Sequence, residues 1–432
     1  MNKLKLLSLV FLILSVNYSF AQTWKSFTSS NSGLPNNIVN SIAVSSDGTV
    51  WFATDSGLAA YKNDVWQVFT DESLLSVNKL NTVSFLPFDS KDIWVGSDSG
   101  LAVFNVDSTE IIGNPVYINR ENNSILSDTV NSAELDGFSN NWIGTAKGLS
   151  VITDKNVYNF NEANGLQSSK VSALKVLPDD WVHIATEGGG VSRLKYNGVD
   201  GITSASRIEN SWSALPSDTV LTIYVTDDTL YWYGTTKGAA TFFGENSKSN
   251  NWWVYNTFSS EIIDNYVRAI VRDNEGNMWF GTRKGLSKLS ADKTSWESFT
   301  EDDGLISNNI FDIKIDKENN IWIATDKGVT FISNNPSAVE NNIETDYKIN
   351  LTNYPNPFNP ETNIAYTIPI TSKVKLEVYN NLGQIVEILV DRKQNSGNYQ
   401  VSFRAKNIPT GIYFCRLTTE RLSLTKKMVL LK

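Results

Sequence analysis

Short apolar stretches alternate with turn-forming residues along most of the chain, and they recur with a regular period. Seven stretches share one pattern: a large ring side chain in an alternating strand, Ala or Gly two residues later, then Thr or Ser, then a turn. The ring residues are Trp51, Trp94, Trp142, His183, Trp232, Trp279 and Trp322. Their spacing of 41 to 49 residues is typical of a four-stranded propeller blade. The pattern predicts an all-β fold with seven blades.

The fixed positions of the repeat have structural explanations. Residues i and i+2 of a strand share a face, so a small residue beside the ring, such as Gly144, lets a neighbouring sheet approach. The Thr or Ser hydroxyl is placed to bond the following turn. We expect a positive φ at the turn glycines, which are Gly57, Gly100, Gly148, Gly189, Gly238, Gly285 and Gly328.

An inner strand precedes each ring residue, and an outer strand follows most of them, but the seventh repeat runs into a polar linker without one. The first residues after the N-terminal apolar run, "TWKSFT" (23–28), repeat the outer-strand motif "WESFT" that begins at Trp296. Residues 23–28 are therefore expected to complete the last blade and to remove an exposed sheet edge. The prediction is a seven-bladed β-propeller over residues 22–335.

Both ends of the chain carry further segments. Two lysines, an apolar run from Leu6 to Val16 and the small residue Ala21 predict a signal peptide over residues 1–21. Residues 336–350 form a polar linker without periodicity. Alternating strands and turns over residues 351–432 predict a small Ig-like β-sandwich.

Composition limits the chemistry. The 432 residues include one Cys, Cys415, and one His, His183, so we expect no disulfide, no metal site, no cofactor and no His-based catalytic triad. Residues 23–340 hold 23 basic and 39 acidic residues, which argues against nucleic acid as a partner. The apolar leader is too short for a bilayer span, so no transmembrane segment is expected, and the chain is expected to be a monomer.

The repeat "W-x-G-T-x-x-G-L", with "G-L-P-x-N" loops, resembles the two-component regulator propeller repeat. That family builds the periplasmic sensor regions of hybrid histidine kinases and also occurs in free-standing secreted proteins. The resemblance implies recognition of a ligand, often an oligosaccharide. The chain shows no kinase region after the propeller, so signalling is not carried over.

The C-terminal region resembles the type A C-terminal sorting domain of the type IX secretion system. The resemblance implies passage across the outer membrane by the type IX machinery, and thus an extracellular or outer-membrane surface location reached through the periplasm. It also implies cleavage of the tail and either release or surface attachment of the cargo. The matching residues are Tyr354, Pro355, Asn356, Pro357, Phe358, Leu382, Gly383, Gln384, Gly411, Ile412, Tyr413, Lys426 and Lys427.

In a propeller, the turns between the second and third strands and the loops from the fourth strand to the next blade share one face. Here that face is polar, which suits a glycan or a polar protein surface. The leading hypothesis is a secreted, non-enzymatic binding propeller. The candidate ligand-binding residues are Asn36, Asn37, Asn78, Lys147, Glu187, Lys237, Tyr266, Arg283, Asn308 and Asn309.

Other interpretations stay open at this point. A secreted carbohydrate-active lyase or hydrolase would need paired carboxylates about 5–9.5 Å apart at the axial opening. A shed, sensor-like partner of a separate kinase is a third class. The acidic turns at Asp273 and Asp316 only faintly suggest calcium, and His183 is expected to be a packed core imidazole. The "DTV" tripeptides at Asp128 and Asp218 fit bacterial O-glycosylation acceptors, but they also start inner strands.

Overall fold

The computed structural model describes residues 23–70, 75, 77–85, 91–177, 181–196, 202–210, 213–226, 230–243, 252–334, 351–368, 372–380, 383–395, 397–406, 408–419 and 423–431. The predicted signal peptide (1–21), the predicted linker (336–350) and Leu382 of the sorting motif lie outside these residues. No helix in the described ranges has the length and apolar character needed to cross a membrane.

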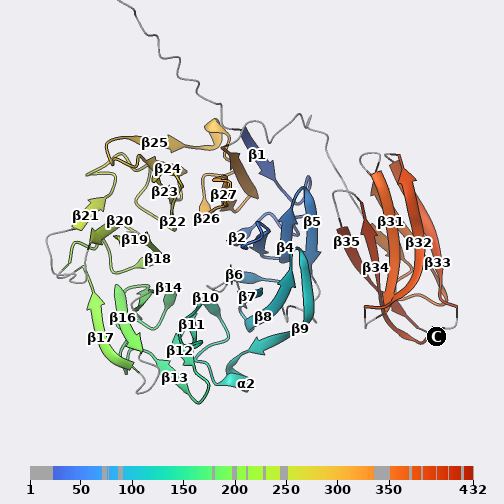
Figure 1. The fold of residues 1–432 in the computed structure, drawn as a ribbon, viewed down its shortest axis with the longest axis horizontal. Helices are drawn as coiled ribbons and strands as arrows, with labels where there is room; N and C mark the ends of the chain where they lie inside the picture. The colour runs from blue at the N-terminus through green and yellow to red at the C-terminus, as the bar shows by residue number, and fades with distance from the viewer. Residues whose placement is uncertain are drawn as a thin grey trace, which may run out of the picture.

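Seven four-stranded antiparallel sheets form a closed ring, with their inner strands around a central axis (Figure 1). Blade 1 consists of β2 (Val39–Val44), β3 (Val50–Thr54), β4 (Gly57–Lys62) and β5 (Val65–Phe69). Blade 2 consists of β6 (Leu80–Phe85), β7 (Asp92–Ser97), β8 (Gly100–Asp107) and β9 (Glu110–Ile118). Blade 3 consists of β10 (Val130–Leu135), β11 (Asn141–Thr145), β12 (Gly148–Ile152) and β13 (Val157–Phe160), and the short helix α2 (Arg120–Asn123) precedes it.

The remaining blades follow the same order from the axis outward. Blade 4 consists of β14 (Val171–Val176), β15 (Trp181–Thr186), β16 (Val191–Tyr196) and β17 (Ile202–Ile208). Blade 5 consists of β18 (Val220–Val225), β19 (Leu230–Thr235), β20 (Gly238–Phe243) and β21 (Trp252–Tyr255). Blade 6 consists of β22 (Ala269–Arg272), β23 (Met278–Gly281), β24 (Leu286–Leu289) and β25 (Trp296–Phe299), and the 3-10 turn η1 (Glu301–Asp303) follows it.

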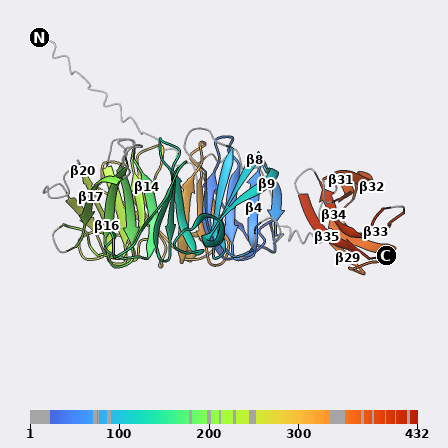
Figure 2. The same cartoon turned by 90° about the horizontal axis from the view of Figure 1, so that it is seen from below.

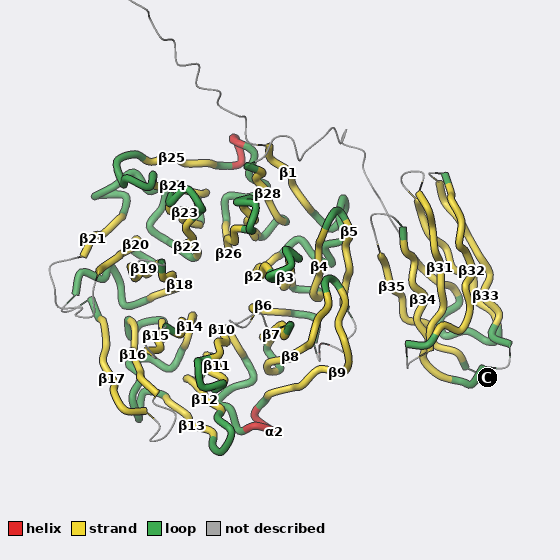
Figure 3. Tube along the Cα trace, in the orientation of Figure 1, coloured by secondary structure: helices red, strands yellow, loops and turns green. Residues whose placement is uncertain are grey.

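Blade 7 joins the two ends of the ring. Its strands β26 (Ile310–Ile315), β27 (Ile321–Thr325) and β28 (Val329–Ser333) are completed by β1 (Thr23–Phe27), which pairs antiparallel with β28 (Figure 3). Trp24 lies opposite Ile332 and Lys25 lies opposite Phe331. This is the pairing that the shared outer-strand motif predicts, and it covers the edge of β28.

The hydrophobic core of the ring is divided among the blade interfaces. Seven clusters of buried residues each join two neighbouring blades. The repeated Trp side chains lie in them, and Trp51, Trp142, Trp232 and Trp279 are at most 1% exposed. Because burying one such ring removes about 150–250 Å² of surface from water, the repeat stabilises the contacts between blades as well as the blades themselves.

The small residues and turn residues of the repeat act as predicted. A Cβ on Gly144 would lie 2.6 Å from Cγ1 of Val171 in the next blade. The Thr282 hydroxyl donates a hydrogen bond to the Gly285 carbonyl oxygen at 2.7 Å, and the same bond recurs in every blade. The turn glycine has a φ between 121° and 138° in six blades.

Blade 4 departs from the prediction. Its turn is one residue longer, so the Thr186 hydroxyl reaches the carbonyl oxygen of Gly190 at 3.0 Å. Gly188 and Gly190 have positive φ values of 101° and 68°, whereas Gly189 is packed against Ser168 and Gln167 without a positive φ. Because of the extra residue, the positive φ that was predicted for Gly189 is found at Gly188 and Gly190 instead.

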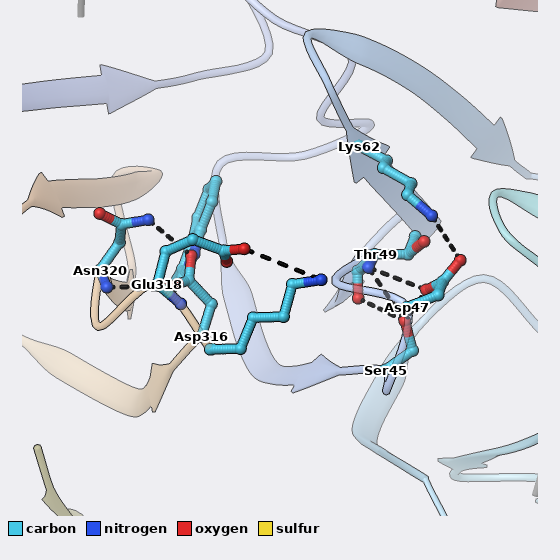
Figure 4. A network of polar contacts seen from close by, with 9 residues as sticks. Ser45, Asp47, Thr49, Lys62, Asp316, Glu318 and Asn320 are labelled. Carbon is cyan, nitrogen blue, oxygen red and sulfur yellow. Dashed lines mark hydrogen bonds and ion pairs between the residues drawn. The ribbon is translucent and has the colours of Figure 1, made fainter. Parts of the chain in front are cut away.

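The side view in Figure 2 shows strands that run along the axis and turns gathered on two faces of the disc. On the face of the first-to-second strand turns, Lys317 of blade 7 lies over Gly48 of blade 1 and pairs with Glu318 at 3.8 Å. Figure 4 shows the turn of Glu318 beside the turn that holds Asp47. In the neighbouring turn, burial opposes ionisation of Asp47, but hydrogen bonds from Lys62, Ser45 and Thr49 outweigh burial and hold the Asp47 pKa well below its usual range.

A charged group also closes the ring near the axis. Asp312 Oδ2 on β26 accepts the backbone N–H of Ile42 on β2 at 2.9 Å. At two other interfaces a serine hydroxyl takes this role, since Ser41 accepts the Val83 N–H and Ser132 accepts the Leu174 N–H. The contact between blades 7 and 1 thus uses a charge-assisted hydrogen bond, which is stronger than its neutral counterparts.

The C-terminal region is a β-sandwich, in agreement with the sequence. One sheet has the order β29 (Leu351–Tyr354), β30 (Glu361–Ile368) and β33 (Gly397–Arg404). The other has the order β32 (Ile385–Gln394), β31 (Ser372–Asn380), β34 (Gly411–Thr418) and β35 (Ser423–Leu430). Phe358, Phe403 and Met428 belong to one core between the sheets. Cys415 is buried there, and burial raises the pKa of its thiol to about 12, as expected for an inert thiol.

Candidate functional site

One face of the ring carries the turns between the second and third strands and the loops that enter each blade, and we call it the loop face. These turns and loops are in contact. Ser307 in the loop before β26 donates to Asp326 in the turn after β27 at 2.6 Å, and Ser168 donates to the Glu187 carbonyl oxygen at 2.9 Å. All ten predicted ligand-binding residues lie on this face.

Several polar side chains of the loop face hold the entering loops in shape. In each case a side-chain oxygen accepts the backbone N–H of a residue seven or eight positions earlier, at 2.6 to 2.8 Å. The pairs are Asn37 with Ser29, Asp128 with Arg120, Asp218 with Asn210, Asn265 with Thr257, and Asn308 with Glu301. Asn36 donates to the Ser56 hydroxyl at 2.9 Å, and Asn78 buries its amide oxygen. The loop face is therefore built from braced loops.

Three of the predicted charged residues lie on successive blades. Lys147 and Lys237 are exposed at the turns of blades 3 and 5. Glu187, in blade 4, pairs with Lys170 at 2.8 Å. The structure does not bring these three side chains into one contact cluster.

In six blades the inner strand has a bulge of one residue near its start, at the axial opening. Blade 6 has Arg268 at the matching position. In order around the ring these residues are Asn40, Asn81, Asn131, Ser172, Leu221, Arg268 and Phe311. The first four each donate a side-chain hydrogen bond to a backbone carbonyl of the next blade, at 2.6 to 3.3 Å. In blades 1 to 4 this position therefore fastens one blade to another.

Blades 5 to 7 break this arrangement. Arg268 has its guanidinium carbon 5.1 Å from the ring centre of Tyr266 and 4.8 Å from that of Phe311. Its Nη1 donates to Asn309 Oδ1 at 3.2 Å. The guanidinium carbon of Arg283 lies 3.3 Å from the Tyr266 ring centre. We call Tyr266, Arg268, Arg283, Asn309 and Phe311 the cation–aromatic cluster.

The electrostatics of this cluster are unusual for an acidic domain. Burial lowers the pKa of Arg268, while Tyr266 and Asp326 favour its charge and Arg283 opposes it. Within the described residues, neither Arg268 nor Arg283 forms an ion pair with a carboxylate. The nearby Asp326 instead accepts from Ser307 at 2.6 Å and from Asn309 at 2.9 Å.

The loop between β21 and β22 positions the cluster. Thr257 donates its N–H to Asn265 Oδ1 at 2.8 Å, and Asn265 Nδ2 donates to the Thr257 hydroxyl at 3.0 Å. Phe258 and Tyr266 each follow one of these two residues in the chain. The Phe258 side chain is 98% exposed, although its backbone N–H is held by Asn256 Oδ1 at 3.0 Å. A braced loop therefore presents an exposed aromatic ring on the residue after Thr257, which is bonded to the residue before Tyr266.

The sequence analysis missed Arg268, Phe311 and Phe258. A comparison between repeats could have found them, because each replaces a polar or small residue. Arg268 and Phe311 stand where earlier repeats have Asn or Ser, and Phe258 stands where other loops have Ser30, Ala163 or Asp302. The alternation of apolar and polar residues along a strand does not reveal these positions, because it cannot distinguish side chains at the axis from other half-buried side chains.

The acidic turns at Asp273 and Asp316 have a structural role. Asp273 Oδ2 accepts the indole N–H of Trp279 at 2.8 Å and the Asn277 amide at 2.9 Å. Asp316 and Asp136 bond Trp322 and Trp142 in the same way, at 3.0 and 2.8 Å. Among the described residues, no group of three or more His, Cys, Asp or Glu side chains could hold a metal ion.

His183 is a core imidazole, as predicted. It is 0% exposed, and its Nδ1 lies 2.9 Å from the Tyr233 hydroxyl. Burial, with a smaller effect from Arg193, lowers the pKa of His183 well below its usual value, so the ring is neutral.

In the sandwich, some sorting residues hold the fold and others are exposed. Phe358 is buried, and Asn356 Oδ1 accepts the Val429 N–H at 2.8 Å. The Tyr413 hydroxyl donates to the Pro409 carbonyl oxygen at 2.7 Å. The exposed sorting residues include Tyr354, Ile412, Lys426 and Lys427.

A seven-bladed ring followed by a small sandwich defines a β-propeller protein with an appended C-terminal domain. The chain contains two component regulator propeller repeats, since the family profile of that description matches residues 33–56, 261–284 and 304–327. It ends in a secretion system C-terminal sorting domain, matched over residues 352–431. The chain is therefore exported by type IX secretion to the cell surface or the extracellular space. No curated protein matches it.

Solved structures with the same fold include relatives of two kinds. One is the extracellular domain of BT3049 from B. thetaiotaomicron, assigned as a hybrid two component system (17% identity, TM-score 0.59, 95% of this chain and 57% of that chain covered). Another is PorZ of Porphyromonas gingivalis, an essential surface component of the type-IX secretion system (16%, 0.57, 93% and 60%). This chain thus spans less than two thirds of either relative.

An enzyme also shares the propeller. The streptogramin B lyase structure has 13% identity and a TM-score of 0.53, with 72% of this chain and 97% of that chain covered. At this level of identity the likeness shows the fold alone.

Proposed function

We propose that the chain is a secreted or surface-displayed, non-enzymatic propeller that binds a polar ligand, a glycan or a protein, on its loop face. The observation that carries this proposal is the break in the axial ring. Blades 1 to 4 use the bulge position to bond the next blade, whereas blades 6 and 7 place Arg268 and Phe311 there. Blade 6 still bonds the next blade, through Arg268 and Asn309, but it uses a charged guanidinium where an uncharged amide serves in blades 1 to 3. A charged group at this place favours a role in binding.

The predicted site residues divide in this proposal. Tyr266, Arg283 and Asn309 form the centre of the ligand-binding site with Arg268 and Phe311. Asn36, Asn37 and Asn308 brace the loops around it, and Asn78 lies in the loop that enters blade 2. Lys147, Glu187 and Lys237 extend the polar face along blades 3 to 5. The type IX machinery is the partner of the sorting domain, and the propeller acts as a monomer.

A carbohydrate-active enzyme is the second candidate, because the streptogramin B lyase shares the fold. The loop-face carboxylates favour the binding role. Asp55 and Asp98 accept hydrogen bonds from Asn40 and Asn81 at 2.8 and 3.0 Å, and Glu187 is paired with Lys170. Carboxylates occupied by amides and ammonium groups are poorly placed for general acid–base chemistry.

A glycan array and an array of surface proteins, probed with the exported protein, test the proposal. We expect binding that is lost in Tyr266→Ala and kept in Phe138→Ala, which changes an exposed aromatic residue on the opposite face. The absence of binding on both arrays would contradict the binding role. Cleavage of a bound glycan, measured as new reducing ends, would instead support the enzyme hypothesis.

A further inference from the structure

Two guanidinium groups share one aromatic ring at the axial opening. Arg268 and Arg283 both contact Tyr266, and Phe311 packs on Arg268 as well. Stacked guanidinium groups are held in a fixed plane, which leaves their in-plane N–H groups to point at an acceptor. Asn309 takes one such bond from Arg268. Tyr266 also favours the charge of Arg268 through a hydrogen bond, and no carboxylate of the described residues pairs with either guanidinium.

The acidic character of the propeller makes the lack of a carboxylate partner for Arg268 and Arg283 informative. Residues 23–340 carry 16 more acidic than basic residues, and yet these two cations have no carboxylate partner within the described part of the chain. Asp326 favours the charge of Arg268, but it is bonded to Ser307 and Asn309 and forms no direct ion pair. Partial burial of Arg268 without a direct ion pair is unfavourable. An anionic group from outside the chain would supply the absent partner, and a carboxylate matches the guanidinium fork with two parallel hydrogen bonds.

The exposed aromatic ring indicates what the anionic group is attached to. Phe258 is 98% exposed on a loop whose ends are tied by Thr257 and Asn265. An aromatic face packs well against the C–H face of a sugar ring. The Asn309 amide accepts from Arg268 and donates to Asp326, so it holds the guanidinium in place beside the two aromatic rings.

We propose that the cation–aromatic cluster, with Phe258, binds a carboxylate-bearing saccharide of the uronate class. The carboxylate pairs with Arg268 and Arg283, and the sugar ring packs on Tyr266 and Phe258. This inference rests on the proposed function and narrows its ligand. An acidic peptide offers the same carboxylate without a sugar face, so the exposed Phe258 favours the saccharide.

Calorimetric titration of the exported protein tests the inference. The probes are trimers of galacturonate, glucuronate and mannuronate, together with their methyl esters, the neutral galactose trimer, a sulfated galactose trimer and an Asp-rich peptide. We expect at least one uronate to bind, and its ester to bind about 10- to 100-fold more weakly, since one charge-assisted hydrogen bond contributes about 1.5–3 kcal/mol. The binding should also weaken as salt is added.

Matched variants locate the site. Arg283→Gln and Phe258→Ala change exposed side chains and should each weaken uronate binding about tenfold or more while leaving the melting temperature unchanged. Arg120→Gln removes another exposed arginine on the same face, across the ring, and should bind normally. Arg268→Gln keeps an amide at the axis and should weaken binding further.

Each other outcome contradicts the inference. Equal binding of the acid and its ester would show that the carboxylate is not recognised. Tighter binding of the sulfated trimer or the peptide would show that the ligand belongs to a different class. Failure of all three uronates to bind overturns it outright. If a neutral glycan or a protein from the arrays still binds through Tyr266, the proposed function stands and only the uronate assignment fails.

Discussion

The buried indole rings show how single residues set the stability of each blade interface. Trp142, Trp279 and Trp322 each donate their indole N–H to an aspartate six residues earlier. Trp51, Trp94 and Trp232 bury the same group without an acceptor in the described residues. A buried indole N–H without an acceptor is costly, so the aspartate stabilises the blades that contain it.

The first prediction concerns this acceptor. Asp273→Ala leaves the Trp279 indole and the Asn277 amide without their partner. We expect the free energy of unfolding to fall by about 1–3 kcal/mol, measured by urea denaturation. Asp302→Ala, an exposed position in η1, is the control and should leave the midpoint unchanged. Equal midpoints for the two variants would contradict the role of the acceptor.

The single histidine predicts a pH dependence. Burial holds the pKa of His183 in the folded chain well below the ordinary 6.5, so the unfolded chain binds a proton that the folded chain does not. Stability is therefore lost as the pH falls below about 6.5, with a slope that approaches about 1.4 kcal/mol per pH unit. Unfolding measured between pH 7.5 and 5 should show this slope. His183→Phe should flatten it, and an unchanged slope in that variant would contradict the assignment.

At the scale of elements, β1 decides whether the ring is closed. Phe27 on this strand packs between blades, with ring centres 5.4 Å from Trp66 of blade 1 and 5.9 Å from Trp322 of blade 7. Every residue from Thr23 to Phe27 has a partner on β28. Without β1, blade 7 would present an open edge, which is a template for aggregation.

Removal of β1 is therefore expected to be severe. Deletion of residues 23–28 should lower the melting temperature and produce aggregates on size-exclusion chromatography. Phe27→Ala, which keeps the strand, should cost about 3–5 kcal/mol but leave a monomer. A deletion variant that melts like the intact protein would show that the pairing with β28 does not stabilise the ring.

At the scale of the whole molecule, the propeller and the sandwich have separate cores. The ring core lies in clusters between blades, while Phe358, Phe403 and Met428 belong to a core of their own. Removal of residues 351–432 should therefore leave a folded propeller, with native circular dichroism and a normal melting temperature, held in the periplasm. Normal amounts of the shortened protein in the medium would contradict the role of the tail in export.

Much of this architecture could be predicted from the sequence. The spacing of the Trp residues gave the number of blades, and the match between "WKSFT" and "WESFT" gave the closing strand. The proposed site was predicted only in part. Tyr266, Arg283 and Asn309 were among the candidates because they lie on the loop face, but nothing in the sequence separated them from Asn37 or Asn308, whose oxygens brace loops.

The sequence by itself determined the blades, the strand that closes the ring and the export domain, because these depend on periodic patterns that each segment carries locally. Only the tertiary structure decided which polar residues meet. Arg268, Arg283 and Phe311 lie up to 43 positions apart on different strands and turns, and they come together because blades 6 and 7 pack side by side. Contacts of that kind arise from the packing of the ring, so no single repeat contains them.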